Sequence, residues 1–148
     1  MLLVSTGFKG LLLGPQSFAQ IFAGGELRLF AGGRPTSANR AQGANLIGTV
    51  RRVDPLDTGL QFVLVDSYVI KPPQDVWQLL AQTNGTVAWW RLVAPGDTGA
   101  DSTTAPRIDG DIGTAASPSD MTLSLVNFNA NQALPIDSFL YTIPPLGA

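Results

Sequence analysis

Aspartates supply the first residues of this chain whose spacing suggests chemistry. Two Asp-Thr-Gly triplets begin at Asp57 and Asp97. Two carboxylates about 3 Å apart that share one proton can catalyse hydrolysis. However, Pro95-Gly96 precedes the second triplet where an apolar strand would be needed, and Asp-Thr-Gly is also a common turn sequence. We therefore expect turns at both triplets rather than an aspartic-type hydrolase.

A second group of carboxylates has the donor type of a cation site. Asp109-Gly110-Asp111, helped by Asp101 or Asp120, could ligate calcium. Such a site needs about six to eight oxygen ligands, and the chain has no loop with the ligand spacing of an EF-hand. A β-turn explains the same residues more simply, so we predict no metal site.

Aromatic residues offer a third kind of site. Trp77, Trp89, Trp90 and Tyr141 would form a sugar-stacking platform if their rings were exposed on one face of a β-sandwich. The competing interpretation is that at least two of the tryptophans pack in the core. A glycan-binding module therefore stays an alternative at this point.

Two residue types are missing from the chain, and their absence excludes several chemistries. The sequence contains no Cys and no His. Disulfides, cysteine zinc sites, Ser-His-Asp and Cys-His nucleophiles and histidine-ligated metals are therefore excluded. No phosphate-binding glycine loop is present either. The sequence predicts a protein that is not an enzyme, with no catalytic residues, no cofactor and no metal.

The charge content restricts the partners. Charged residues make up 14% of the 148 residues, with a net charge of −2, compared with about 25% charged residues in soluble domains. Basic residues are scattered, so we expect no nucleic-acid partner. The apolar stretch 10–25 is too short and too polar to span a bilayer, so we expect no membrane partner. Weak charge suits a large buried contact, and it also suits a small domain with a neutral polar surface.

The strand that must organise these residues covers 85–93, Gly-Thr-Val-Ala-Trp-Trp-Arg-Leu-Val. Alternation along a strand sends Trp89 and Trp90 to opposite faces. Both faces are largely apolar, and one of them also carries Arg91. We therefore expect both faces to be covered, either by the chain itself or by a neighbouring molecule.

The remaining elements are a helical region followed by short strands. The sequence predicts a helix within residues 5–23, with Pro15 at a first helical position and a shorter helical turn over 8–13. Predicted strands cover 26–30, 46–53, 60–70, 85–93, 121–125 and 137–143. The segment 76–82 fits a strand or a helical turn, and 107–112 fits a short edge strand or a tight turn. Loops are predicted at 34–45, 94–106 and 113–120. The fold class is mainly β, an antiparallel β-sandwich or jelly-roll-like domain over 25–148, with an arm and short helix over 1–24 that pack on the sheet.

The order of these segments resembles a group of small virion proteins of tailed bacteriophages. The resemblance lies in residues 25–39, 43–50, 85–93, 107–113 and 120–123, where a strand, a Gly/Arg-Pro loop and a second strand precede the tryptophan strand. It implies a capsid decoration, or cement, protein on the virion surface, assembled in the host cytoplasm. It also implies contacts with the major capsid protein and with copies of itself as a homo-oligomer. A tail or head–tail component is the alternative within the same group.

A decoration protein must present contact residues. We expect them in segment 1–14 and in the loops 34–45 and 94–106. Trp89 and Arg91 are expected as an outward-facing pair, since both residue types are enriched at binding hot spots. The alternative is that the N-terminal helix covers Trp89. The full set of interface candidates is Trp89, Arg91, Phe8, Leu11, Arg34 and Arg40.

Overall fold

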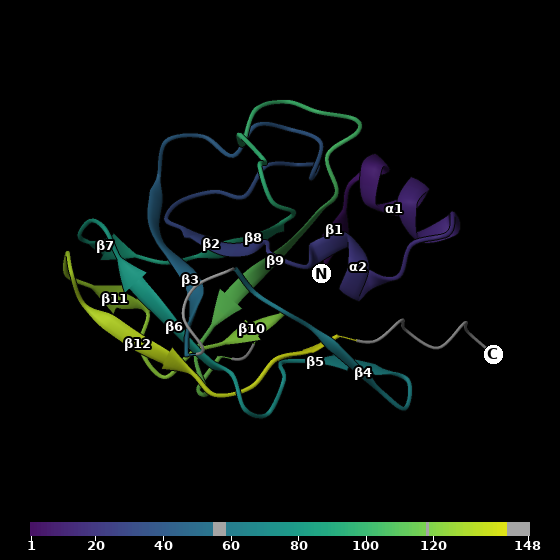
Figure 1. Cartoon of the computed structure of the whole chain (residues 1–148). Helices are drawn as coiled ribbons and strands as arrows, with labels where there is room; N and C mark the ends of the chain where they lie inside the picture. Colours follow the sequence, from purple (N-terminus) through teal and green to yellow (C-terminus); the bar gives the residue numbers. More distant parts are fainter. Residues whose placement is uncertain (55–58, 118, 142–148) are drawn as a thin grey trace.

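The computed structural model describes residues 1–54, 59–117 and 119–141 (Figure 1). The chain is mainly β, with a large antiparallel sheet and a short helical region at the N-terminus, as the sequence predicts. The helices are α1 (Thr6–Leu13) and α2 (Phe18–Phe22). The strands are β1 (Leu3–Val4), β2 (Glu26–Phe30), β3 (Leu46–Asp54), β4 (Val63–Val65), β5 (Tyr68–Ile70), β6 (Val76–Ala81), β7 (Gly85–Thr86), β8 (Trp89–Val93), β9 (Arg107–Gly113), β10 (Met121–Thr122), β11 (Asn127–Phe128), β12 (Ala133–Ile136) and β13 (Leu140–Tyr141).

The large sheet has the strand order β1-β9-β8-β2-β3-β6-β12, and β10 adds to β9. Its pairs are antiparallel except for β10 with β9, which is parallel. Two smaller sheets have the orders β11-β7 and β13-β5-β4. The helices lie at one end of the molecule, near the hairpin of β4 and β5 (Figure 1).

The helical region contains two helices, in agreement with the predicted shorter turn over 8–13 ahead of the main helix, but the second helix begins at Phe18 and not at Pro15. Ser5 caps α1 by accepting a hydrogen bond from the Phe8 N–H, at 3.1 Å. Ser17 and Gln20 form a capping box at the start of α2. Pro15 lies in the turn between the helices. Two separate capping signals therefore decide the helix starts.

The segment 60–70 also differs from its prediction as one long strand. It forms the hairpin of β4 and β5, which register as Val63 with Ile70, Leu64 with Val69 and Val65 with Tyr68. Asp66, in the turn, has a φ of 54°. Aspartate is one of the few residue types that adopt this left-handed conformation, so the chain reverses here instead of continuing.

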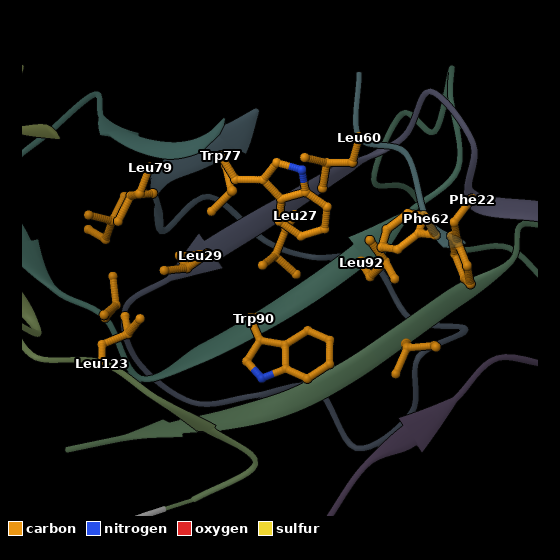
Figure 2. Packing of buried hydrophobic residues seen from close by; sticks show 14 of the residues in the cluster. Phe22, Leu27, Leu29, Leu60, Phe62, Trp77, Leu79, Trp90, Leu92 and Leu123 are labelled. Atoms are coloured by element: carbon orange, nitrogen blue, oxygen red, sulfur yellow. The ribbon is translucent and has the colours of Figure 1, made fainter. Parts of the chain in front are cut away.

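The inner face of the large sheet carries the core. Register places Leu27 beside Leu92 and Leu29 beside Trp90. Phenylalanines from both helices and from the segment before β4 complete the buried cluster. Figure 2 shows Trp77 and Trp90 entering this cluster from different strands. Each buried Leu or Phe contributes roughly 1.5–3 kcal/mol relative to an exposed one.

The outer face of the same sheet is divided into two parts. The loops 31–45 and 94–106 cover the part over β2, β8 and β9, and they are joined by Gln42 N–H to Gly99 O and Ser102 N–H to Asn39 O, at 2.9 and 2.8 Å. Over β3 and β6 the face is open, with Leu80 51% exposed. Figure 1 shows the two loops side by side above β2 and β8.

Candidate functional site

Asp97, the candidate acid of the second Asp-Thr-Gly triplet, is held by an arginine. Its carboxylate accepts two hydrogen bonds from the Arg107 guanidinium, at 2.7 and 2.8 Å, and a third from the Gly99 N–H at 2.7 Å. Burial raises the pKa of Asp97, but these hydrogen bonds and the charges of Arg107 and Arg28 outweigh burial and lower it below 3.8. Asp97 therefore stays ionised at neutral pH, and its hydrogen bonds to Gly99 and Arg107 hold the 94–106 loop in place. Asp57, of the first triplet, lies outside the described residues.

Asp109, the candidate calcium ligand, is also occupied. The Nε and Nη2 groups of Arg91 donate hydrogen bonds to the two carboxylate oxygens of Asp109, at 2.6 and 2.8 Å. Both side chains are fully buried. A third nitrogen of Arg91 donates to the carbonyl oxygen of Arg40, at 2.8 Å. The described part of the chain holds no group of three or more acidic, histidine or cysteine residues that could hold a metal ion.

A third arginine, Arg28, lies beside a hollow of about 330 Å³ between β2 and the 94–106 loop. Its guanidinium donates to Glu26 at 2.7 Å, to the Gln42 side chain at 2.9 Å and to the carbonyl oxygen of Asp97 at 2.7 Å. Glu26 also binds Arg51, at 3.1 Å. The charged groups around the hollow thus neutralise one another instead of presenting a free acid or base.

These contacts form one unit, which we name the arginine cluster. It consists of Arg28, Arg91 and Arg107 with Glu26, Asp97 and Asp109. Arg91 and Arg107 donate to backbone carbonyls of the 34–45 loop, and Arg107 also donates to Ala100 in the 94–106 loop. The cluster therefore fastens both loops to the outer face of the sheet.

The tryptophans are covered, which removes the sugar platform. Trp77, Trp89 and Trp90 are 1%, 2% and 5% exposed. Trp89 stacks on Phe30 with ring centroids 4.2 Å apart, and Arg91 lies 5.5 Å from the Trp89 ring centroid. A sugar needs an open aromatic face, so these rings do not provide one.

The expectation that Trp89 and Arg91 face outward is therefore wrong. Arg91 is neutralised by Asp109 and fixed to the loop at Arg40, so the pair is enclosed by the chain itself. The alternative cover, the N-terminal helix, is also wrong. The helices belong to the core cluster on the inner face, which contains Trp90 and not Trp89.

The other interface candidates divide into buried and accessible residues. Phe8 is 1% exposed and packs on Phe18 and Phe22, so its assignment as a contact residue is wrong. Leu11 is half-buried and packs against the core. Arg34 is half-buried, with Nη1 3.5 Å from a carboxylate oxygen of Asp111, and Arg40 is exposed.

Segment 1–14 is fixed to the sheet, although the sequence suggests a contact arm. Within it, β1 pairs with β9, Leu3 opposite Asp109 and Val4 opposite Ile108. The buried Ser5 hydroxyl donates to Ala105 O and accepts from the Arg107 N–H, both at 2.8 Å. The arm therefore contributes an edge strand and a helix cap.

Accessible apolar residues lie in segment 1–14, at Met1, Leu2 and Leu13, and also on the β4–β5 hairpin and the open part of the outer face, which sequence patterns did not select. On the hairpin, Leu64 and Tyr68 are 69% and 43% exposed. On the open part of the outer face, Val53, Val76 and Leu80 are 41%, 45% and 51% exposed. The polar residues Asp66-Ser67 inside the run 60–70 are the one signal that could have identified the hairpin.

No family model, curated protein or solved structure matches this chain. Within the described residues, neither helix is long and apolar enough to cross a membrane. The geometry of the surface is thus the basis for assigning a function.

Proposed function

We propose that this chain is a non-enzymatic virion structural protein that decorates a phage capsid and bridges neighbouring capsid subunits. The observation that carries the proposal is the division of side chains between interior and surface. Two ion pairs of the arginine cluster, Arg91–Asp109 and Arg107–Asp97, are buried, whereas apolar side chains stand exposed on an open sheet at Val53, Val76 and Leu80. A subunit that works by contact requires an accessible apolar surface, and it requires no reacting group.

The open part of the outer face is the surface that we assign to the capsid protein. We name it the outer sheet surface; it consists of Thr49, Arg51, Val53, Val76, Gln78 and Leu80. It contains a hollow of about 360 Å³. Apolar side chains mixed with amide and guanidinium groups are typical of a protein interface that has an apolar core and a polar rim. Many copies that each bury a modest area add up to a large stabilisation of a shell.

The assignment to a phage particle is supported by the resemblance of the segment order to small phage virion proteins. The major capsid protein and copies of the chain itself are then the partners, and the capsid surface is the location. A tail or head–tail component is the second candidate, because the same resemblance covers both groups. The two candidates differ in copy number.

The first test is the copy number in purified particles, measured by quantitative mass spectrometry against the major capsid protein. We expect a ratio close to that of the shell protein. A small number of copies would instead indicate the tail or neck, and absence from particles would contradict both candidates.

The second test addresses the outer sheet surface. Leu80→Lys places a charge at its centre and is expected to lower particle occupancy about tenfold, the loss typical of one hot-spot residue. Leu13→Lys is the matched control, since Leu13 is 89% exposed and lies at the end of α1. Equal occupancy of the two variants would contradict this assignment of the surface.

A further inference from the structure

The outer edges of the described sheets differ in how they are protected. β1 and β10 cover the edge of β9 at different points along it. β12 carries Pro135, which has no N–H to offer a partner strand. β4 pairs with β5 and with no other described strand, and its residues Val-Leu-Val include no charge and no proline. Proteins usually protect such edges, so an unprotected one indicates a strand-pairing site.

The exposed side chains of β4 indicate what kind of structure could bind to this strand. Val63, Leu64 and Val65 are 37%, 69% and 48% exposed. Because neighbouring side chains on a strand point to opposite faces, β4 is open on both faces and along one edge. Another extended strand is the structure that covers all three at once.

The register of the hairpin determines which backbone groups are available. Val65 and Tyr68 flank a turn of two residues. In such a hairpin the flanking residues exchange their backbone hydrogen bonds, and the next residue along, Leu64, directs its N–H and C=O away from β5. The open edge of β4 is therefore centred on Leu64.

We propose that β4 pairs antiparallel with β4 of a second copy of this chain, around a two-fold axis at Leu64. Each Leu64 then exchanges N–H to C=O bonds with Leu64 of the other copy, and Val63 faces Val65. The pairing joins two three-stranded sheets, β13-β5-β4, into one of six strands.

Charge distribution favours a second copy in this orientation. Asp66 is the acidic residue that follows β4. In the antiparallel arrangement the two Asp66 residues lie at opposite ends of the paired strands, whereas a parallel pair would place like charges side by side. On the helix-facing side, Leu64 lines an apolar groove of about 240 Å³ together with Leu12, Phe18 and Tyr141. The two-fold axis places the grooves of both copies on the same face of the joined sheet, and this inference does not depend on the proposed capsid function.

A cysteine variant tests the register directly, because the natural chain contains no cysteine. Directly opposed residues that exchange both hydrogen bonds have Cα atoms about 5.5 Å apart, within disulfide reach. Leu64→Cys is therefore expected to form a covalent dimer under mild oxidation. Val65→Cys and Leu80→Cys are the matched controls. The two Val65 positions lie diagonally, about 7–8 Å apart, and Leu80 lies on the outer sheet surface, so both controls should remain largely uncrosslinked.

Light scattering of the unoxidised full chain tests the same pairing without a new thiol. We expect a mass of twice 15.6 kDa for the natural chain and for Leu80→Lys. Leu64→Lys should give the single-chain mass, because two ammonium groups meet at the axis.

A natural chain that is monomeric, a Leu64→Lys variant that remains dimeric, or equal crosslinking of all three cysteine variants would each overturn the proposal. A monomeric chain whose Leu64→Lys variant no longer binds particles would assign this edge to the capsid protein instead.

Discussion

Two regions at the periphery of this fold differ in their side chains: one contains paired charges and the other contains exposed apolar residues. On the covered part of the outer face, three arginines and three carboxylates bind one another and the carbonyls of two loops. On the hairpin of β4 and β5, apolar residues stand exposed, and the strand edge lacks charge. The first region has a composition that suggests a binding or catalytic site, yet its groups already have partners within the chain.

The difference between the two regions shows which of them can gain free energy by binding a partner. Removing either member of a buried ion pair leaves an uncompensated charge, so the arginine cluster is committed to holding the loops. An exposed apolar strand gains free energy when a partner covers it, because apolar surface leaves water. We therefore expect substitutions in the cluster to change folding stability, and substitutions on the hairpin to change association.

The largest expected effect follows Asp109→Ala. The variant leaves Arg91 buried without a counter-charge, so the free energy of unfolding should fall by about 3–5 kcal/mol. Urea denaturation of the natural chain and the variant measures the difference. The double variant Arg91→Met, Asp109→Leu removes both charges and is expected to recover most of the loss. A decrease under about 1 kcal/mol in Asp109→Ala would contradict the buried pair.

A smaller effect is expected for Asp97→Asn, which loses charge-assisted hydrogen bonds to Arg107 and should cost about 1.5–3 kcal/mol at neutral pH. Because the folded state lowers the pKa of Asp97 below 3.8, its carboxylate stabilises the fold above that pH. This stabilisation is lost as the pH falls through the lowered pKa.

The variant should therefore show a weaker loss of stability below about pH 4 than the natural chain. Thermal unfolding followed from pH 7 to pH 2.5 tests this. Asp101→Asn serves as the control, since Asp101 is exposed and accepts one hydrogen bond, from the Ala41 N–H. Parallel acid profiles for the natural chain and Asp97→Asn would contradict the role of Asp97.

A third substitution, Ser5→Ala, tests the connection between the N-terminal segment and the arginine cluster. The buried hydroxyl serves both the start of α1 and the backbone of Arg107, so its removal should cost about 1–2 kcal/mol. Ser17→Ala removes only the exposed cap of α2 and should cost about 0.5–1 kcal/mol. Equal losses in urea denaturation would mean that the contact with Arg107 adds nothing.

Local patterns predicted several strands because alternation and turn residues act over short distances. The segment 26–30 is β2 as expected, 46–53 lies within β3, and Trp89 and Trp90 do face opposite sides. The predicted strand 85–93 is instead divided into β7 and β8, and 121–125 contains only the two residues of β10. The two N-caps were also readable, since Ser17 and Gln20 have the capping-box spacing. The serine before each helix would have placed both helix starts correctly, whereas Pro15 placed the second start three residues too early.

What covers each face could not be predicted, because it depends on contacts distant in sequence. Arg91 is neutralised by Asp109, 18 residues later, and the 34–45 loop closes over both. No spacing rule relates those positions, so an apolar strand with one arginine fits an outward or an enclosed face equally well. The exposed hairpin was missed for a related reason: the run 60–70 is apolar, and apolar strands are usually buried.

The smallest expected effect concerns that hairpin and completes the comparison. At concentrations where the chain is monomeric, Leu64→Gln should change the free energy of unfolding by no more than about 0.5 kcal/mol, since the side chain is 69% exposed. Leu79→Ala provides the contrast, because Leu79 is fully buried on the neighbouring sheet and its truncation should cost about 2–5 kcal/mol. Urea denaturation of both variants measures the two losses in free energy of unfolding. A Leu64→Gln loss close to that of Leu79→Ala would mean that the hairpin is part of the folding core, and a surface that the fold itself requires would no longer be free to bind a partner.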